Sequence, residues 1–191
     1  LLLKYHNESK NIGGLAFTYG AIGNINLYKK KYKVAISYYR LSLKKYKLAG
    51  KENSISNIYS NIGMAFRYLK KFNKAEYYLD LQRKIDYKND NKPGIVRSLI
   101  NLGTVYSKTN RIEEALKNNL KAIKLSNKLD LQPYTSVACL NAAEVYYHLG
   151  NFKKARIFNQ KSLNISSKLN IHQSILESNK LNSKLNLKTN V

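Results

Sequence analysis

The chain has 191 residues, with 34 Lys and Arg against 11 Asp and Glu, so its formal net charge is +23. Hydrophobic residues make up 43% of the sequence and charged residues 24%, which is typical of a folded protein and excludes an intrinsically disordered one. A single Cys excludes an internal disulfide framework, and no apolar run approaches the length of about 18 residues that a membrane-spanning helix needs.

Three sets of residues recur at an interval of 40 along the chain, without any insertion. One set holds a small residue, a second holds Ala, and the third holds an aromatic or aliphatic residue three positions before that Ala. The sets are Gly23, Gly63, Gly103 and Ala143; Ala35, Ala75, Ala115 and Ala155; and Tyr32, Phe72, Ile112 and Phe152. Because the three sets, which we call columns, share the same interval, they predict four copies of one structural unit.

Apolar residues recur at i, i+3, i+4 and i+7 within each copy, which predicts a pair of α-helices per copy. We expect the first helices to begin near residues 13, 53, 93 and 133. Pro93 and Pro133 suit a first helical turn, and the side chain of Asn53 can cap one. The second helices should begin near residues 31, 71, 111 and 151.

The turns inside the four copies fall at different residue types. Asn110 and Gly150 suit the left-handed backbone that closes a helix. Lys30 and Lys70 fit that geometry less well, which points to another type of turn in the first two copies.

The small residues of the first helices let two helix backbones approach closely. We expect Tyr32 and Phe72 to fill the space beside Gly23 and Gly63. One such hairpin cannot bury its apolar face alone, so neighbouring hairpins should stack into a solenoid.

These columns resemble the tetratricopeptide repeat, over roughly residues 11–170. An aromatic residue also follows the small residue by three in most copies, at Phe66, Tyr106 and Tyr146. The interval is longer than the common unit of about 34 residues, and the Pro usual after the second helix is absent. The 40-residue unit is similar to the longer variety of this repeat in bacterial peptide-sensing regulators and sensor input domains. The resemblance implies an all-α fold, a right-handed α-solenoid of about four hairpins with flanking or capping helices.

The interval divides the chain into segments. We assign the tail of a preceding helix to 1–10, repeats to 11–50, 51–90, 91–130 and 131–170, and a capping helix with a frayed end to 171–191. Because the sequence begins with Leu1 rather than Met, we expect a fragment of a longer protein.

The sequence contains no convincing catalytic constellation. His6, His148 and His172 lack the spacing of a metal site. Cys139 shares a column with Tyr59 and Leu99, which favours a buried packing role over a nucleophile. We therefore predict no enzyme activity, no cofactor and no metal.

The resemblance implies that the first helices line a concave groove. Asn61, Asn101 and Asn141 form one column there, and their amides could hold the main chain of an extended peptide. An equally weighted alternative is that these amides tie adjacent helices together. Neighbouring inner positions would read the side chains of a ligand, and they are Asn24, Arg67, Tyr68, Arg97, Thr104, Lys108, Glu144, Tyr147 and His148.

The family's chaperone-binding members use a clamp that holds two carboxylates. Asn24, Asn61 and Arg97 match three of its places, whereas Gly20 and Asn101 stand at the remaining basic places. The match is partial and does not assign that ligand.

Most Lys residues fall in turns and second helices, which favours a solvated surface over a nucleic-acid site. The function that the sequence favours is non-catalytic binding of a protein or peptide segment in the groove. The alternatives are a sensory or regulatory input domain of a larger bacterial signalling protein and a basic nucleic-acid-binding repeat. The ends of a solenoid also allow self-association. The sequence does not decide the compartment, with the cytoplasm slightly favoured.

Overall fold

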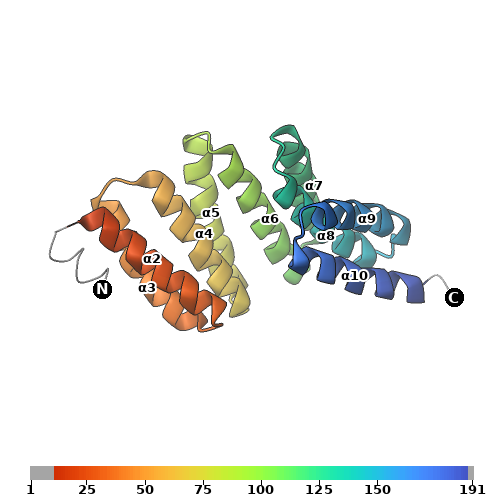
Figure 1. Cartoon of the computed structure of the whole chain (residues 1–191), viewed down its shortest axis with the longest axis horizontal. Coiled ribbons are helices and arrows are strands. Elements are labelled where there is room, and N and C mark those ends of the chain that lie inside the picture. Colours follow the sequence, from red (N-terminus) through yellow and green to blue (C-terminus); the bar gives the residue numbers. More distant parts are fainter. Residues whose placement is uncertain (1–10, 189–191) are drawn as a thin grey trace. The chain divides into compact units, whose positions relative to one another are not determined.

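The computed structural model describes residues 11–188. These residues form nine α-helices and contain no strand, so the predicted all-α class is confirmed (Figure 1). The predicted helix tail at 1–10 lies outside the described residues. The helices are α2 (Ile12–Tyr28), α3 (Tyr32–Leu48), α4 (Glu52–Tyr68), α5 (Phe72–Lys88), α6 (Lys92–Lys108), α7 (Ile112–Lys128), α8 (Gln132–His148), α9 (Phe152–Lys168) and α10 (His172–Leu187).

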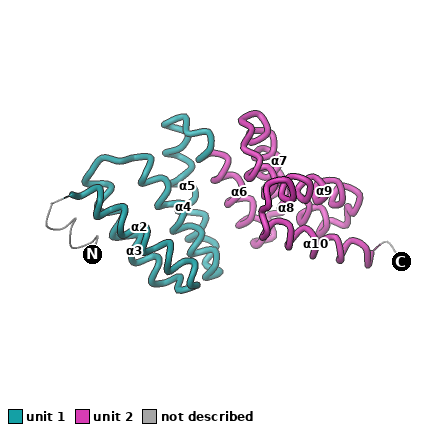
Figure 2. Tube along the Cα trace, in the orientation of Figure 1, with its two compact units in different colours: residues 1–94 teal, residues 95–191 magenta. Residues whose placement is uncertain are grey.

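The helices belong to two compact units, which comprise residues 1–94 and 95–191 (Figure 2). In the first unit α2 packs against α3, α3 against α4, and α4 against α5. In the second unit α8 packs against both α7 and α9, and α10 packs against α9 and α8. Antiparallel hairpins are thus the building blocks of each unit.

The helices begin where the sequence predicts. The first helices of the four copies begin at 12, 52, 92 and 132, and the second helices at 32, 72, 112 and 152. Pro133 occupies the first turn of α8 as expected. The expected cap at Asn53 is wrong, because the N-cap residue of α4 is Lys51, which makes no side-chain cap bond. Asn53 lies inside the helix, where its Oδ1 accepts a hydrogen bond of 3.1 Å from Asn89 Nδ2.

All connections between consecutive described helices have the same backbone geometry. A residue with positive φ closes each turn, at Lys30, Gly50, Lys70, Asp90, Asn110, Asp130, Gly150 and Asn170. The different turn type expected at Lys30 and Lys70 is therefore wrong. In the first turn Lys30 N donates to Leu27 O at 2.9 Å and Lys31 N donates to Asn26 O at 2.8 Å. These two bonds satisfy carbonyls at the helix end, which offsets the strain of about 1–2 kcal/mol at a left-handed Lys.

The small residues of the first helices face side chains in the middle of the second helices. A Cβ at Gly23 would meet the ring of Tyr39, and one at Gly63 would lie 2.7 Å from Leu79 Cγ. Tyr32, which was expected to fill this space, instead stacks on Tyr68 with ring centroids 5.1 Å apart. Tyr39 is seven residues, or about two helical turns, beyond Tyr32, so the closest approach lies deeper in the hairpin than the sequence suggested.

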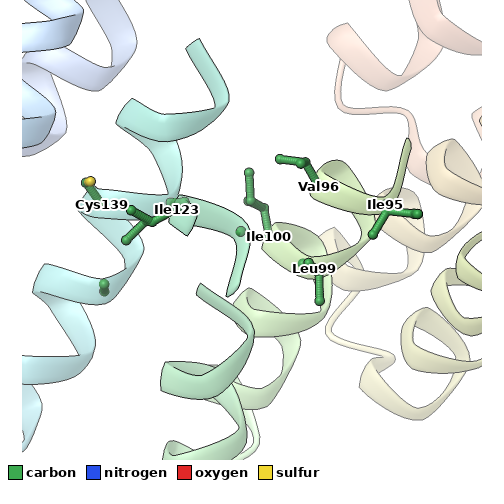
Figure 3. Packing of buried hydrophobic residues seen from close by; sticks show 9 residues of the cluster. Ile95, Val96, Leu99, Ile100, Ile123 and Cys139 are labelled. Atoms are coloured by element: carbon green, nitrogen blue, oxygen red, sulfur yellow. The ribbon is translucent and has the colours of Figure 1, made fainter. Parts of the chain in front are cut away.

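Aliphatic side chains fill the core of the second unit (Figure 3). Ile95, Val96, Leu99 and Ile100 of α6 pack in one cluster with residues of α7 and α8. Cys139 of α8 is fully buried within it, as predicted from its column.

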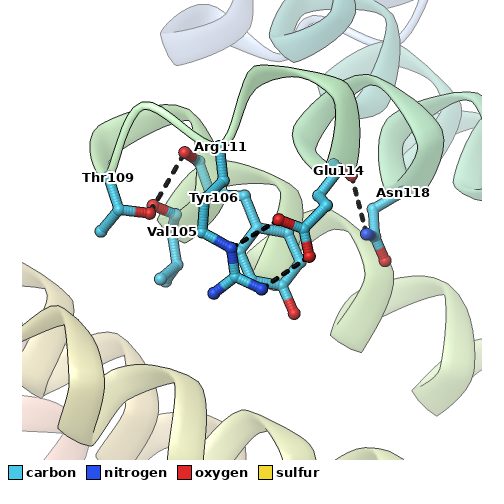
Figure 4. A network of polar contacts seen from close by, with 6 residues as sticks. All are labelled: Val105, Tyr106, Thr109, Arg111, Glu114 and Asn118. Carbon is cyan, nitrogen blue, oxygen red and sulfur yellow. Dashed lines mark hydrogen bonds and ion pairs between the residues drawn. The ribbon is translucent and has the colours of Figure 1, made fainter.

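A polar network fixes the turn between α6 and α7 (Figure 4). Arg111 Nε and Nη2 donate to the two carboxylate oxygens of Glu114 at 2.6 Å each. The guanidinium carbon of Arg111 lies 4.0 Å from the centroid of the Tyr106 ring. The hydrogen bond from Arg111 is the main cause that lowers the pKa of Glu114 below its usual range. Thr109 Oγ1 donates to the carbonyl of Val105 at 3.0 Å, and Asn118 donates to that of Glu114.

Candidate functional site

The predicted site residues stand on the first helices, α2, α4, α6 and α8. We call the surface that carries the columns of Asn61, Asn24 and Tyr28 the first-helix face. Within each unit this face remains accessible, since the Asn column is half-buried and Tyr28, Tyr68, Lys108 and His148 are exposed. Each unit carries its own first-helix face, and the two are described in turn.

Hydrogen bonds join the Asn column to the preceding first helix. In the first unit Asn61 Nδ2 donates to Asn24 Oδ1 at 3.1 Å. In the second unit Asn141 Nδ2 donates to Thr104 Oγ1, also at 3.1 Å. Both bonds join residues 37 positions apart, so they repeat with the structural unit. These bonds of Asn61 and Asn141 agree with the alternative in which the amides of the column tie adjacent helices together. Each amide has a second N–H and a carbonyl oxygen that a ligand can use.

A small pocket opens beside Asn24 and Asn61 in the first unit. Its volume is about 250 Å³, and Phe17, Ala21 and Asn57 also line it. The phenol of Tyr39 donates to Asn24 Oδ1 at 2.9 Å. Burial raises the pKa of Tyr39 to about 12, so the phenol remains a donor in alkaline solution where an ordinary Tyr would begin to ionise. Asn24 Oδ1 therefore accepts from both Tyr39 and Asn61, and its orientation is fixed.

An aromatic and cationic cluster lies at the end of α4. The guanidinium carbon of Arg67 is 4.6 Å from the centroid of the Tyr68 ring, which also stacks on Tyr32. Arg67 Nε is buried and has no hydrogen-bond partner among the described residues. Tyr68 is 48% exposed, so this cluster offers a ring to an apolar side chain and a cation beside it.

The second unit gathers four of the predicted residues into one pocket. Lys108 at the end of α6 and Glu144, Tyr147 and His148 at the end of α8 line a cavity of about 530 Å³. Tyr147 contacts His148 edge-on, with ring centroids 5.8 Å apart. The lining does not include Arg97 and Asn101, which are half-buried on α6.

Helix α10 completes this pocket with residues that sequence reasoning missed. They are Glu177, Lys180, Leu181, Ser183 and Lys184. Extending the 40-residue columns by one copy would have found three of them, because Glu177 lies two intervals beyond Arg97, and Leu181 and Lys184 lie one interval beyond Asn141 and Glu144. The missing signal was the small residue of the first helix, since Ser183 replaces the Gly or Ala of that column.

The pocket carries charges of both signs. Glu177 Oε1 accepts hydrogen bonds from Lys180 Nζ and Gln173 Nε2 at 3.0 Å each. Within residues 11–188 no ion pair involves Lys108, Lys184 or Glu144, so these three charges in the cavity can meet a ligand. The arrangement suits a ligand with a carboxylate and a polar or cationic group.

A larger cavity, of about 800 Å³, lies on the side of the second helices, where the sequence predicted no site. Amide side chains border it, together with the exposed Ile157 and the half-buried Ile165. The lining residues are Asn127, Gln132, Arg156, Ile157, Gln160, Lys161, Asn164, Ile165 and Asn182.

Residues 11–188 contain no group of three or more His, Cys, Asp or Glu side chains arranged to hold a metal ion. None of the helices described is long and apolar enough to cross a membrane.

A sequence model of the tetratricopeptide repeat matches residues 54–128 and 95–168, which together span more than half of the chain. The chain belongs to the tetratricopeptide repeat family. No curated protein sequence matches it significantly.

Solved structures share the tetratricopeptide fold at low sequence identity. Aspartyl phosphate phosphatase F from Bacillus subtilis is 19% identical, with a TM-score of 0.80 over 89% of this chain and 45% of its own. A Rap conjugation gene regulator of the plasmid pLS20, solved with the Phr* peptide, is 17% identical, with a TM-score of 0.72 over 86% and 45%.

A signal transduction ATPase with a tetratricopeptide repeat sensor from Pyrococcus horikoshii is 22% identical, with a TM-score of 0.74 over 90% of this chain and 27% of its own. The chain thus spans less than half of the length of each of these three proteins. The likenesses confirm the predicted class of all-α solenoid built from helical hairpins.

Proposed function

We propose that the first-helix face binds an extended peptide or protein segment without catalysis. The observation that carries the proposal is the pocket of Lys108, Glu144, Tyr147 and His148, which three helices of the second unit build. The cavity of about 530 Å³ combines an aromatic side chain, a carboxylate and two lysines that form no ion pair within residues 11–188, and it can hold one or two residues of a peptide.

The Asn column supports the same proposal. Its bonds to the preceding helix fix Asn61 and Asn141, so their remaining amide groups are held in place before a ligand arrives. Fixed donors and acceptors lose little conformational entropy on binding, which favours recognition of a peptide main chain. The similar fold of the pLS20 regulator, which was solved with a peptide, agrees with this proposal.

Peptide selection tests the proposal. We would select binders from a displayed library of random linear peptides and measure the affinity of a synthetic binder by calorimetry. The variant K108A/K184A should lose tenfold or more in affinity, equal to about 1.4 kcal/mol. The control variant K121A/K128A removes the same charge from exposed positions on a second helix and should bind as the original does.

Equal losses in the two variants would show attraction by net charge alone and contradict the proposal. Failure to select any peptide that competes at the first-helix face would contradict it as well.

A sensory or regulatory role is a second candidate, which the sensor of the Pyrococcus horikoshii ATPase and the plasmid gene regulator favour. In this case a selected peptide would change the output of an attached effector domain. Assaying the product of the complete gene with and without the peptide separates this role from passive binding.

The formal charge of +23 favours a third candidate, nucleic-acid binding. Nonspecific contacts with phosphates weaken steeply with salt. Retention of single-stranded or duplex nucleic acid at about 0.2 M salt would support this candidate, and its loss would leave charge alone as the explanation.

A further inference from the structure

Helix α3 carries a row of exposed aliphatic side chains on its outer side. Val34, Leu41 and Leu48 are 43%, 45% and 66% exposed. They follow one another at intervals of seven residues, which places them along one line of a helix. With a rise of 1.5 Å per residue, the row spans about 21 Å.

The same positions in the other second helices are almost all charged. The exposed aliphatic row is therefore specific to α3 and is not a general feature of the repeat. The equivalents of Val34 are Lys74, Glu114 and Lys154; those of Leu41 are Leu81, Lys121 and Lys161; and those of Leu48 are Lys88, Lys128 and Lys168.

A row of cations runs beside the aliphatic row. Lys33, Arg40 and Lys47 each precede one of the three aliphatic residues, and Lys44 lies between them; all four are exposed. No Asp or Glu occurs in residues 9–51, so the sequence around α3 offers these cations no acidic neighbour. The outer surface of α3 therefore combines a narrow apolar line with a positive border.

We propose that this surface of α3 docks an acidic amphipathic helix of a partner protein. A line one side chain wide with a period of seven matches the seam between two helices. The cations beside the line would face Asp and Glu that flank the apolar residues of the partner. This surface lies on a second helix and is separate from the first-helix face, so the inference does not depend on the proposed function.

The chemistry of the surface disfavours two other occupants. A second copy of the chain would bring two rows of cations together, which costs energy when like charges are close. Helices that bind a bilayer surface present a broad apolar face that contains aromatic residues. The three aliphatic residues of α3 form only a narrow line.

A designed peptide tests the proposal. The probe is a helical peptide of about 21 residues with Leu every seventh position and Glu on both sides. The control probe has the same composition in scrambled order. We expect the chain to bind the first peptide and to bind the scrambled one at least tenfold more weakly.

The variant V34K/L41K/L48K distinguishes docking from charge. Each substitution introduces the residue type that other repeats hold at the same column, so the fold should persist, as far-UV circular dichroism would show. Adding three positive charges strengthens any nonspecific attraction to an acidic peptide. Docking on the aliphatic row predicts the opposite, a loss of tenfold or more. The control variant N73K/Y77K/Y87K adds the same charge at exposed positions of α5 and should retain binding.

Three outcomes would overturn the proposal. One is equal or tighter binding of the peptide by V34K/L41K/L48K. Another is that the chain binds vesicles of phosphatidylcholine and phosphatidylserine but not the peptide, and that V34K/L41K/L48K abolishes the vesicle binding. The third is a dimer in analytical ultracentrifugation that the same substitutions dissociate.

Discussion

The side-chain amide of Asn141 donates to the hydroxyl of Thr104 over 3.1 Å, across two first helices of one unit. The hydroxyl of Thr104 donates in turn to the carbonyl of Ile100 at 3.0 Å. Asn141→Ala should therefore lower the free energy of unfolding by about 1 kcal/mol. A double-mutant cycle with Thr104→Val, followed by urea denaturation, should give a coupling energy of at least about 0.5 kcal/mol. Strictly additive effects would show that the bond contributes nothing.

The Asn column also makes a prediction about binding. Replacing Asn61 and Asn101 by Ala should weaken a selected peptide without unfolding the chain, because both residues are only half-buried. Calorimetry measures the affinity and circular dichroism checks the fold. An unchanged affinity would mean that these amides have a structural role only.

Gly23 and Tyr39 leave no room for a methyl group between them. A Cβ at position 23 would lie 2.5 Å from Cδ1 of the Tyr39 ring, which is fully buried. Gly23→Ala should therefore destabilise the chain by about 1–3 kcal/mol. Helix propensity alone predicts a stabilisation of about 1 kcal/mol. Thermal or urea unfolding decides between the two, since they have opposite signs.

Asp86 is fully buried in the first unit and accepts three hydrogen bonds. The donors are Ser56 Oγ at 2.6 Å, Asn91 Nδ2 at 2.8 Å and Gln82 Nε2 at 3.1 Å. Asp86→Ala leaves Ser56 and Asn91 without this acceptor, whereas Gln82 Nε2 keeps its bond of 3.2 Å to the carbonyl of Gly94. We therefore expect a loss of about 3 kcal/mol in urea denaturation.

Glu52→Ala is the matched control for Asp86→Ala. It removes a carboxylate whose 2.7 Å contact with Lys88 is exposed to solvent, and it should change stability far less. Similar losses in both variants would contradict a special role for the buried network.

Cys139 provides a reporter of local opening, because it is the single Cys of the chain. Burial raises the pKa of its thiol to about 11, against a small lowering by Lys161. At about pH 8 a thiol reagent should therefore react slowly with the native chain and rapidly in denaturant. Fast labelling of the native chain would show that the core around α8 opens.

The same raised pKa predicts a dependence of stability on pH. The folded state holds the proton of Cys139 more tightly than the unfolded state does. Its contribution to stability is therefore complete below about pH 9 and is lost as the pH rises toward about 11. Cys139→Ala should remove this part of the alkaline destabilisation, as urea denaturation at several pH values would measure.

The sequence predicts the helices well, because the evidence for them is local and repeated. Pro133 and the Ala35 column fix where helices begin and which side is buried, and the helix starts agree within one residue. The turns at Lys30 and Lys70 were mispredicted, because residue preference favours Gly in a left-handed conformation. The packing of neighbouring helices, which the interval of 40 imposes on every copy, outweighs that preference.

The candidate site was less predictable. Lys108, Glu144, Tyr147 and His148 follow from the columns, and they do line one pocket. The contribution of α10 does not follow, since its columns lose the small residue that marked the other first helices. The bond between Asn141 and Thr104 depends on the distance between two helices, which the sequence spacing alone does not give.

The left-handed residues recur every 20 positions, from Lys30 to Asn170, although a complete hairpin takes 40. The connection from a first to a second helix is thus interchangeable with the connection back. Duplication or loss of 40 codons would add or remove a hairpin and keep every other residue in its role. Duplication of only 20 would keep the spacing of the turns, yet it would place each downstream first helix where a second helix belongs.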